Sequence, residues 1–249
     1  ELVFKLTPVL QEVFQGYWFA DKMPRYSLQD SSNIRAVREA SAELIAKVAQ
    51  FPETVGDRKI LRFLNGHGDD VAKATEMFTK FLQWRIDQKV DTIRQNIVFG
   101  EFNHPSKFPH ADLILKMIPQ VCITTSARDK IGSPICVETY DFVPGEILKH
   151  IPLENYIEFT IYALEYKSLI VEQLSEEADN AYLAGLSSDE EREIALDPQG
   201  TTAPWGTLVN TCVVRDLAAV GFDHIGSDGR RIINTIIGVA SDNYPELLR

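Results

Sequence analysis

The cysteines and histidines are the side chains of this sequence whose chemistry would suit a nucleophile or a metal ligand. None of the cysteines stands in CxxC spacing or has a histidine at a supportive distance along the chain. We therefore expect Cys122, Cys136 and Cys212 to be buried as small hydrophobic side chains. The histidines are scattered, and a metal site at His104 and His110 is the weaker interpretation of their proline-rich segment.

No motif of a phosphate-binding or hydrolytic enzyme is present. No strand leads into Gly66-His67-Gly68, and no Lys-Ser/Thr pair follows it. A Gly-x-Ser-x-Gly elbow is also absent from the sequence. An enzyme on a doubly wound sheet would need a polar cluster at the carboxyl ends of its strands, and Asp141 and Asp216 have no evident partner there. The sequence therefore predicts no catalytic residue, no metal and no cofactor.

Arg215 stands inside an otherwise apolar strand, so its guanidinium must be paired or exposed. Two interpretations are open: it holds the carboxylate or phosphate of a ligand, or it is bonded to Glu138 or lies at a wet strand end. Alternate residues of a strand share a face, which defines two sets, Cys136, Glu138 and Tyr140 on one strand and Thr211, Val213 and Arg215 on its neighbour. If these sets line a pocket, that pocket contains two opposite charges.

These side chains must be positioned by a helical first part and an α/β second part. Apolar spacing predicts helices over 34–48, 58–64 and 70–85, the third with Asp69 as its N-cap. Trp84 and Arg85 end that third helix, as a packed aromatic and a capping cation.

The second part alternates strands with helices. Strands are predicted over 134–140, after a turn at 128–133, and over 208–217. A helix of about six turns begins near Leu153. Ser227 and Asp228 cap a last helix, whose inward residues are Ile232, Ile233, Ile236, Ile237 and Ala240. This order is typical of crossover connections on a mostly parallel sheet.

The composition narrows the class of protein. A chain of 249 residues with 45% hydrophobic residues can bury a substantial core. Its net charge of −11 argues against a nucleic-acid partner. No run of about 18 apolar residues, no secretory layout and no Asn-x-Ser/Thr acceptor occurs, which favours a soluble cytoplasmic protein, expected to be a monomer. Membrane contact would then be peripheral, through a local patch.

Three motifs in order resemble the CRAL-TRIO (Sec14-like) lipid-binding family: the helical segment with Ile60–Leu64, Asp69–Ala74 and Trp84-Arg85, the string 129–135, and Asp242-Asn243-Tyr244-Pro245-Glu246. The resemblance implies an N-terminal extension (1–33), a three-helix segment (34–100) and a partial α/β lipid-binding domain (106–249), truncated before its last strands and gate helix.

The resemblance also implies binding residues. Phosphatidylinositol binders of this family carry an Arg-Lys pair where this chain has His67 and Gly68, and they share a glutamate at Glu246. A mostly neutral histidine offers a phosphate less than two cations do, so phosphoinositide binding is in doubt. Phosphatidylcholine binders place two tyrosines and two hydroxyl residues at Cys122, Cys136, Thr211 and Val213, of which Thr211 keeps its chemistry.

The resemblance implies binding and intermembrane transfer of a hydrophobic ligand in an internal pocket. The partners would be a lipid and, transiently, a membrane surface. A protein-interaction module of similar fold without a ligand is the alternative. The acidic segment 175–206 is predicted to be a solvated loop that acts as a spacer, and a regulatory or partner-binding insertion is the weaker interpretation.

Overall fold

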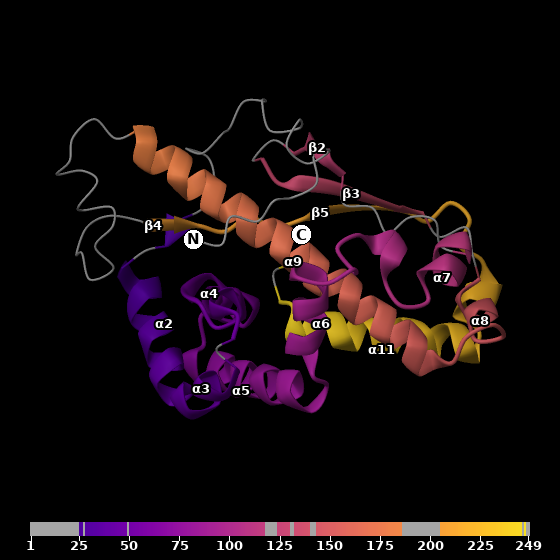
Figure 1. Cartoon of the computed structure of the whole chain (residues 1–249), viewed down its shortest axis with the longest axis horizontal. Helices are drawn as coiled ribbons and strands as arrows, with labels where there is room; N and C mark the ends of the chain where they lie inside the picture. Colours follow the sequence, from indigo (N-terminus) through magenta and orange to yellow (C-terminus); the bar gives the residue numbers. More distant parts are fainter. Residues whose placement is uncertain are drawn as a thin grey trace.

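The structure is a computed structural model that describes residues 25–26, 28–48, 50–117, 124–129, 132–139, 143–185, 205–245 and 247. Cys122, Tyr140 and Glu246 lie outside these residues, as do most of the predicted N-terminal extension and residues 186–204 of the predicted acidic loop. The elements keep their labels from Figure 1.

The helical first part is formed by α2 (Leu28–Ala40), α3 (Ala42–Val48), the 3-10 helix η3 (Pro52–Thr54), α4 (Asp57–Gly66) and α5 (Val71–Asp87). The single helix predicted over 34–48 is wrong, because the chain turns at Ser41, whose buried hydroxyl lies 3.5 Å from that of Thr79. The N-cap of α5 is Asp70, which accepts a hydrogen bond from Lys73 N, whereas Asp69 adopts a left-handed φ of 63° in the preceding turn.

Aromatic side chains hold α4 and α5 together. Phe63 lies with its ring centroid 5.4 Å from Phe78 and 5.3 Å from Phe81, and none of the three is exposed. These rings lie in the core of the helical part. Burying each aromatic side chain contributes about 1.5–3 kcal/mol to the stability of the fold.

Four described helices between α5 and α9 were not predicted from the sequence. They are α6 (Val90–Val98), the 3-10 helix η4 (Pro105–Lys107), α7 (Ala111–Met117) and α8 (Pro144–Ile147). The last three have at most seven residues and lie beside prolines. So few residues do not show a helical period of apolar positions, and the sequence alone does not distinguish these helices from loops.

The main sheet has the strand order β2 (Thr124–Arg128), β3 (Pro134–Thr139), β5 (Cys212–Asp216). β2 was not predicted, but the turn after it was: Gly132 has a φ of 94°, and Ser133 N donates to Asp129 Oδ1. So short a turn can join only antiparallel strands, and β2 and β3 are antiparallel.

β3 and β5 are parallel. The expected mostly parallel sheet is therefore wrong for the described strands, since β4 (Trp205–Thr207) also pairs antiparallel with β1 (Arg25–Tyr26).

The long helix α9 (Leu153–Gly185) links β3 to β5 and crosses the molecule diagonally (Figure 1). Its 33 residues span about 50 Å. The predicted loop is therefore wrong over 175–185. Its acidic composition does not prevent a helix there, because Arg58 of α4 forms ion pairs with both Glu172 and Asp179.

The second predicted strand is shorter than expected. Leu208, Val209 and Asn210 precede β5 outside any described strand, because side chains satisfy their backbone groups. Ser175 Oγ accepts from Val209 N at 3.0 Å, and Arg62 Nη2 donates to Val209 O at 2.6 Å.

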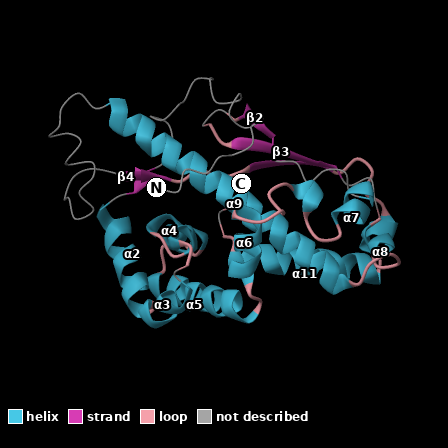
Figure 2. Cartoon of the chain, in the orientation of Figure 1, coloured by secondary structure: helices cyan, strands magenta, loops and turns pink. Residues whose placement is uncertain are grey.

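The last helix, α11 (Ser227–Asn243), follows the 3-10 helix η5 (Phe222–Ile225). Its N-cap is Gly226, so Ser227 and Asp228 lie in the first turn and the predicted caps are wrong. Ile232 is buried as predicted, but Ile237 is 58% exposed. The fold is thus mixed α/β, rich in helix around a small sheet (Figure 2).

Candidate functional site

The predicted pocket residues of β3 and β5 do meet on one face of the sheet. Cys136 is in register with Val213, and Glu138 with Arg215. Cys136 is fully buried, and α9 lies over this face, because Lys167 Nζ of α9 is 3.6 Å from Glu138 Oε1. The opposite face is open among the described residues, since Val137 and Val214 are 47% and 49% exposed.

Arg215 is paired within the sheet. Its Nε donates to Glu138 Oε2 at 3.1 Å, and its side chain is 49% exposed. Of the two interpretations of Arg215, the structure contains the ion pair with Glu138. Glu138 therefore stands between two cations, Arg215 on the neighbouring strand and Lys167 on α9.

The described cysteines do not form a reactive pair. Cys136 is buried and Cys212 is half-buried, and both are free thiols. Cys212 is in register with Ile135, so Cys136 and Cys212 point to opposite faces of the sheet. Among the described residues, no group of three or more His, Cys, Asp or Glu side chains could hold a metal ion.

Thr211 and His67 lie at a junction of three segments: the end of α4, the start of β5, and the residues Tyr244, Pro245 and Leu247. Thr211 N donates to Leu247 O at 2.9 Å. A Cβ added to Gly66 would lie 3.0 Å from Pro245 Cβ, so the end of α4 is in close contact with this turn. His67 is the C-cap of α4 and is half-buried. The junction thus brings together Thr211, His67 and the residues on either side of Glu246.

Thr211 has the most notable polar group at this junction. Its side chain is fully buried, and its Oγ1 has no hydrogen-bond partner among the residues that the structure describes. An unpaired buried hydroxyl costs about 1–3 kcal/mol relative to a paired one.

Arg62 and Lys59 of α4 form hydrogen bonds that connect this helix to the junction. Arg62 donates to Asn210 Oδ1 at 2.7 Å and to Val209 O, just before Thr211. Lys59 Nζ donates to Asn243 O at 3.2 Å, at the carboxyl end of α11, and lies 4.4 Å from the Phe81 ring centroid. Burial lowers the pKa of Lys59 well below its ordinary value, and the charge of Glu165 only partly opposes this effect.

A buried cluster of ionic side chains adjoins the junction. Glu165 of α9 accepts from Arg85 Nη1 at 2.9 Å, from Arg94 Nη1 at 2.8 Å and from the Tyr244 hydroxyl at 2.6 Å. Arg85 also pairs with Asp91, and Arg94 with Glu53. Arg85, Arg94 and Glu165 are each no more than 2% exposed, so their charges must neutralise one another.

The sequence prediction for Arg85 as a helix cap is wrong, because its guanidinium points to Glu165 instead. The predicted packing of Trp84 is confirmed, since its ring lies 6.0 Å from that of Tyr244 in an edge-on contact. Glu165 was missed. The available signal was its spacing, because Glu165 stands four residues after Ile161 on the apolar face of the helix, where a charge needs a partner.

The cluster shifts the titration of its members. Burial opposes the ionisation of Glu165, but Arg85 and then Arg94 outweigh it and lower the pKa of Glu165 to about 2. Burial, and next the charge of Glu165, raise the pKa of Tyr244 well above its ordinary value. Glu165 is thus a carboxylate and Tyr244 a hydrogen-bond donor at neutral pH.

A small cavity lies between this cluster and the junction. It has a volume of about 30 Å³ and is lined by Lys59, Arg85, Glu165, Tyr244 and Leu247 among others. Because one water needs about 10–15 Å³ of such volume, this cavity has room for about two waters and not for a lipid.

No family model matches the chain. Curated proteins do match it. The phosphatidylinositol/phosphatidylcholine transfer protein SFH11 of Arabidopsis thaliana is 25% identical over 224 residues, 88% of this chain and 49% of that protein. SFH4 of the same plant is 25% identical over 89% of this chain and 30% of its own length.

Another relative is more similar over a shorter stretch. The SEC14 cytosolic factor of Eremothecium gossypii is 35% identical over 109 residues, 43% of this chain and 32% of that protein. The chain thus spans half or less of the length of each of these relatives.

Proposed function

The chain is a relative of the Sec14-like transfer proteins of the CRAL-TRIO family, and we propose that it binds a hydrophobic lipid in an internal pocket and carries it between membranes. It would act as a carrier without a catalytic step. We place this activity in the cytoplasm, with transient contact at membrane surfaces. Among the described residues, no helix is both long and apolar enough to span a bilayer.

The observation that carries the proposal is the unpaired hydroxyl of Thr211. The resemblance expects a headgroup contact at this position, and Thr211 Oγ1 is buried without a partner in the described part of the chain. A lipid phosphate or ester oxygen would satisfy it. Because a hydrogen bond to a charged group contributes about 1.5–3 kcal/mol, this contact would favour a phospholipid over a lipid without a phosphate.

The acyl chains need a larger space than the cavity beside Tyr244. Each methylene kept from water contributes about 0.8 kcal/mol, so a chain of about sixteen carbons needs shelter of roughly 10 kcal/mol. We place the chains along the sheet face that holds Cys136 and Val213, where α9 already excludes water from Cys136.

The headgroup would carry less negative charge than a phosphoinositide. His67 stands where the family's phosphoinositide binders place cations, and Arg62 of the same helix is already bonded to Asn210 and Val209. Thr211 would then contact a lipid with a single phosphate, with His67 and Glu246 as further headgroup candidates.

Two measurements test this function. Native mass spectrometry of the chain purified gently from cells should show a bound lipid, and vesicle assays should show transfer of phosphatidylcholine. Thr211→Val should reduce transfer about tenfold, whereas Thr211→Ser should retain it. Thr207→Val is the matched control, because Thr207 Oγ1 is also buried without a described partner but lies in β4.

Equal transfer by the Thr211→Val variant and the wild type would contradict the headgroup contact. A chain that purifies without a lipid and transfers none would contradict the carrier itself. That result would favour a protein-interaction module of the same fold.

A further inference from the structure

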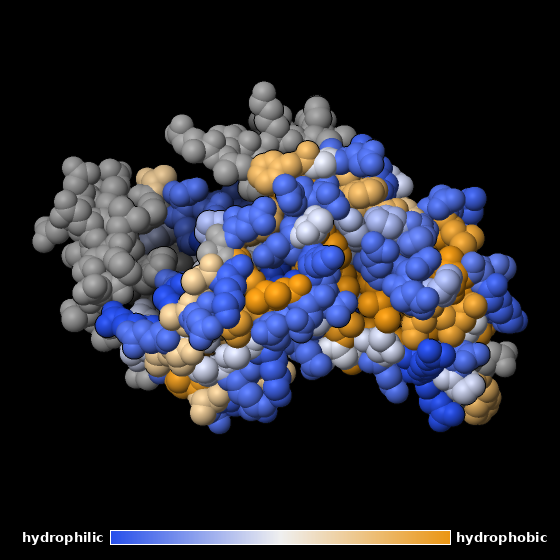
Figure 3. Space-filling view, turned by 60° about the horizontal axis from the view of Figure 1, so that its bottom comes forward, coloured by the Kyte–Doolittle hydropathy of each residue, from blue (hydrophilic) through white to orange (hydrophobic). Residues whose placement is uncertain are grey.

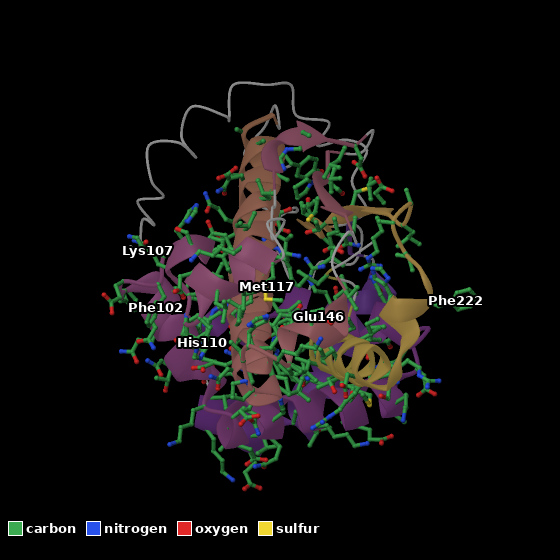
Figure 4. All side chains as sticks on the ribbon, turned by 90° about the vertical axis from the view of Figure 1, so that its right-hand side faces the viewer. Phe102, Lys107, His110, Met117, Glu146 and Phe222 are labelled. Atoms are coloured by element: carbon green, nitrogen blue, oxygen red, sulfur yellow. The ribbon has the colours of Figure 1, made fainter. Side chains whose placement is uncertain are left out.

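The loop that follows β5 exposes three large apolar side chains. Leu217 is 58% exposed, Val220 is 42% exposed and Phe222 is 91% exposed. In Figure 4, Phe222 stands clear of the ribbon, on the opposite side of the view from Lys107 and His110. We call Leu217–Phe222 the apolar loop. Apolar side chains exposed to this extent contribute little to the core, so the fold alone does not explain them.

The apolar loop is held in shape by local hydrogen bonds. Val220 N donates to Leu217 O at 3.0 Å, and Ala218 N donates to Asp216 Oδ1 at 2.9 Å. Gly221 N donates to Nδ1 of His224 at 3.1 Å, and His224 is buried beneath the loop. Two consecutive turns therefore present Val220 and Phe222 outward without an ordering step on binding.

The position of the loop suits contact with a surface. It begins at the carboxyl end of β5, at the same edge of the sheet where the parallel strand β3 ends. Figure 3 shows hydrophobic surface over the half of the molecule that holds α7, α8 and α11, and α11 packs directly against the 3-10 helix that begins with Phe222.

Charge does not oppose such a contact. The sequence around the loop is balanced in charge, with Arg215, Arg230 and Arg231 against Asp216, Asp223 and Asp228. The chain as a whole carries −11. This local balance lets the loop approach a phospholipid surface that the average charge of the protein would not favour.

We propose that Leu217, Val220 and Phe222 insert into the boundary between the headgroups and acyl chains of a phospholipid bilayer. A projecting loop needs a deformable partner, which a bilayer is, whereas a protein partner would need a matching pocket for Phe222. The inference rests on the proposed function, because a carrier that moves lipids between membranes must touch them.

Vesicle flotation tests the insertion directly. The wild type and the Phe222→Ser variant are mixed with phosphatidylcholine vesicles and separated on a gradient. We expect the variant to partition about tenfold less, since a phenyl ring no longer leaves water. Phe99→Ser is the matched control, because Phe99 is 62% exposed at the C-cap of α6 and should leave partitioning unchanged.

A second variant reports the environment of the side chain. In Phe222→Trp, the additional indole emission should shift to shorter wavelength on addition of vesicles and should be quenched by brominated phosphatidylcholine. Equal flotation of the Phe222→Ser variant and the wild type, or an indole that vesicles do not affect, would overturn the insertion.

The outcomes separate the two proposals. A chain that purifies with bound lipid, and whose flotation does not depend on Phe222, retains the carrier function and loses the insertion loop. A chain without lipid whose flotation depends on Phe222 retains the loop and loses the carrier.

Discussion

The hydroxyl of Tyr244 donates a 2.6 Å hydrogen bond to Oε1 of Glu165, and through it the turn after α11 is bonded to the middle of α9. Both side chains are buried, and Glu165 also receives the guanidinium groups of Arg85 and Arg94. The helical part of the chain and the two long helices of the α/β part therefore share one carboxylate.

Replacing Tyr244 by Phe should lower the free energy of unfolding by about 1.5–3 kcal/mol, because it removes a hydrogen bond to a buried charge. Urea denaturation followed by circular dichroism measures this difference. Tyr162→Phe is the control: its hydroxyl accepts a neutral hydrogen bond from Asn96 at 3.2 Å, and its loss should cost about 0.5–1.5 kcal/mol. A larger loss for Tyr162→Phe would contradict the assigned role of Tyr244.

Glu165→Gln should destabilise the protein by about 3 kcal/mol, because it leaves two buried guanidinium groups short of one carboxylate. This loss of unfolding free energy is near the low end of the range for broken buried ion pairs. Arg85 keeps its ion pair with Asp91, and Arg94 keeps its ion pair with Glu53. Glu158→Gln is the matched surface change, with His110 at 3.5 Å, and should cost less than about 1 kcal/mol. Similar urea midpoints for both variants would show that the cluster does not stabilise the fold.

Acid should weaken the protein over the range in which unfolded Glu165 titrates. Its pKa falls from 4.5 to about 2 in the fold, so between these values the unfolded chain binds a proton that the folded chain does not. Stability from this group is complete above pH 4.5 and is lost as the pH falls towards 2, by roughly 3 kcal/mol. The stability difference between the wild type and the Glu165→Gln variant should therefore shrink with acid. A difference that stays constant from pH 5 to pH 2.5 would disprove the low pKa.

Two glycines of α11 should respond to alanine with opposite signs. A Cβ on Gly229 would lie 2.2 Å from His224 O, so Gly229→Ala must displace backbone and should cost more than about 1 kcal/mol. Gly238 has no atom within 4 Å of such a Cβ, and Gly238→Ala should stabilise the helix by about 0.5–1 kcal/mol. Thermal unfolding of the two variants measures both changes, and a stabilised Gly229→Ala variant would contradict the close packing under the apolar loop.

The cysteines should differ in reactivity. Cys136 is fully buried and Cys212 half-buried on the opposite face of the sheet. Under native conditions N-ethylmaleimide should therefore label Cys212 about tenfold faster than Cys136, as measured by mass spectrometry of their peptides. Oxidation should not join the two within one chain. An intramolecular disulfide between them would require a different register of β3 and β5.

Local patterns in the sequence were sufficient for the longer elements of the fold. The helices around Ile60 and Phe78, the strand from Pro134 and the last helix follow from apolar spacing, and the turn before Pro134 follows from its glycine. Elements shorter than two helical turns were missed, because so few residues cannot establish a period. The acidic end of α9 was misjudged, because composition does not show that Arg58, distant in the sequence, lies beside Glu172.

The sequence by itself determined the longer helices and the strands around Cys136 and Val213, because apolar spacing depends on neighbours a few residues apart. Only the tertiary structure decided that Arg85 meets Glu165, eighty residues later in the chain, and that Thr211 lies beside the turn after Tyr244. A buried charge or hydroxyl needs a partner from any part of the chain. Spacing along the sequence cannot identify that partner, because the partner depends on which surfaces of the fold pack together.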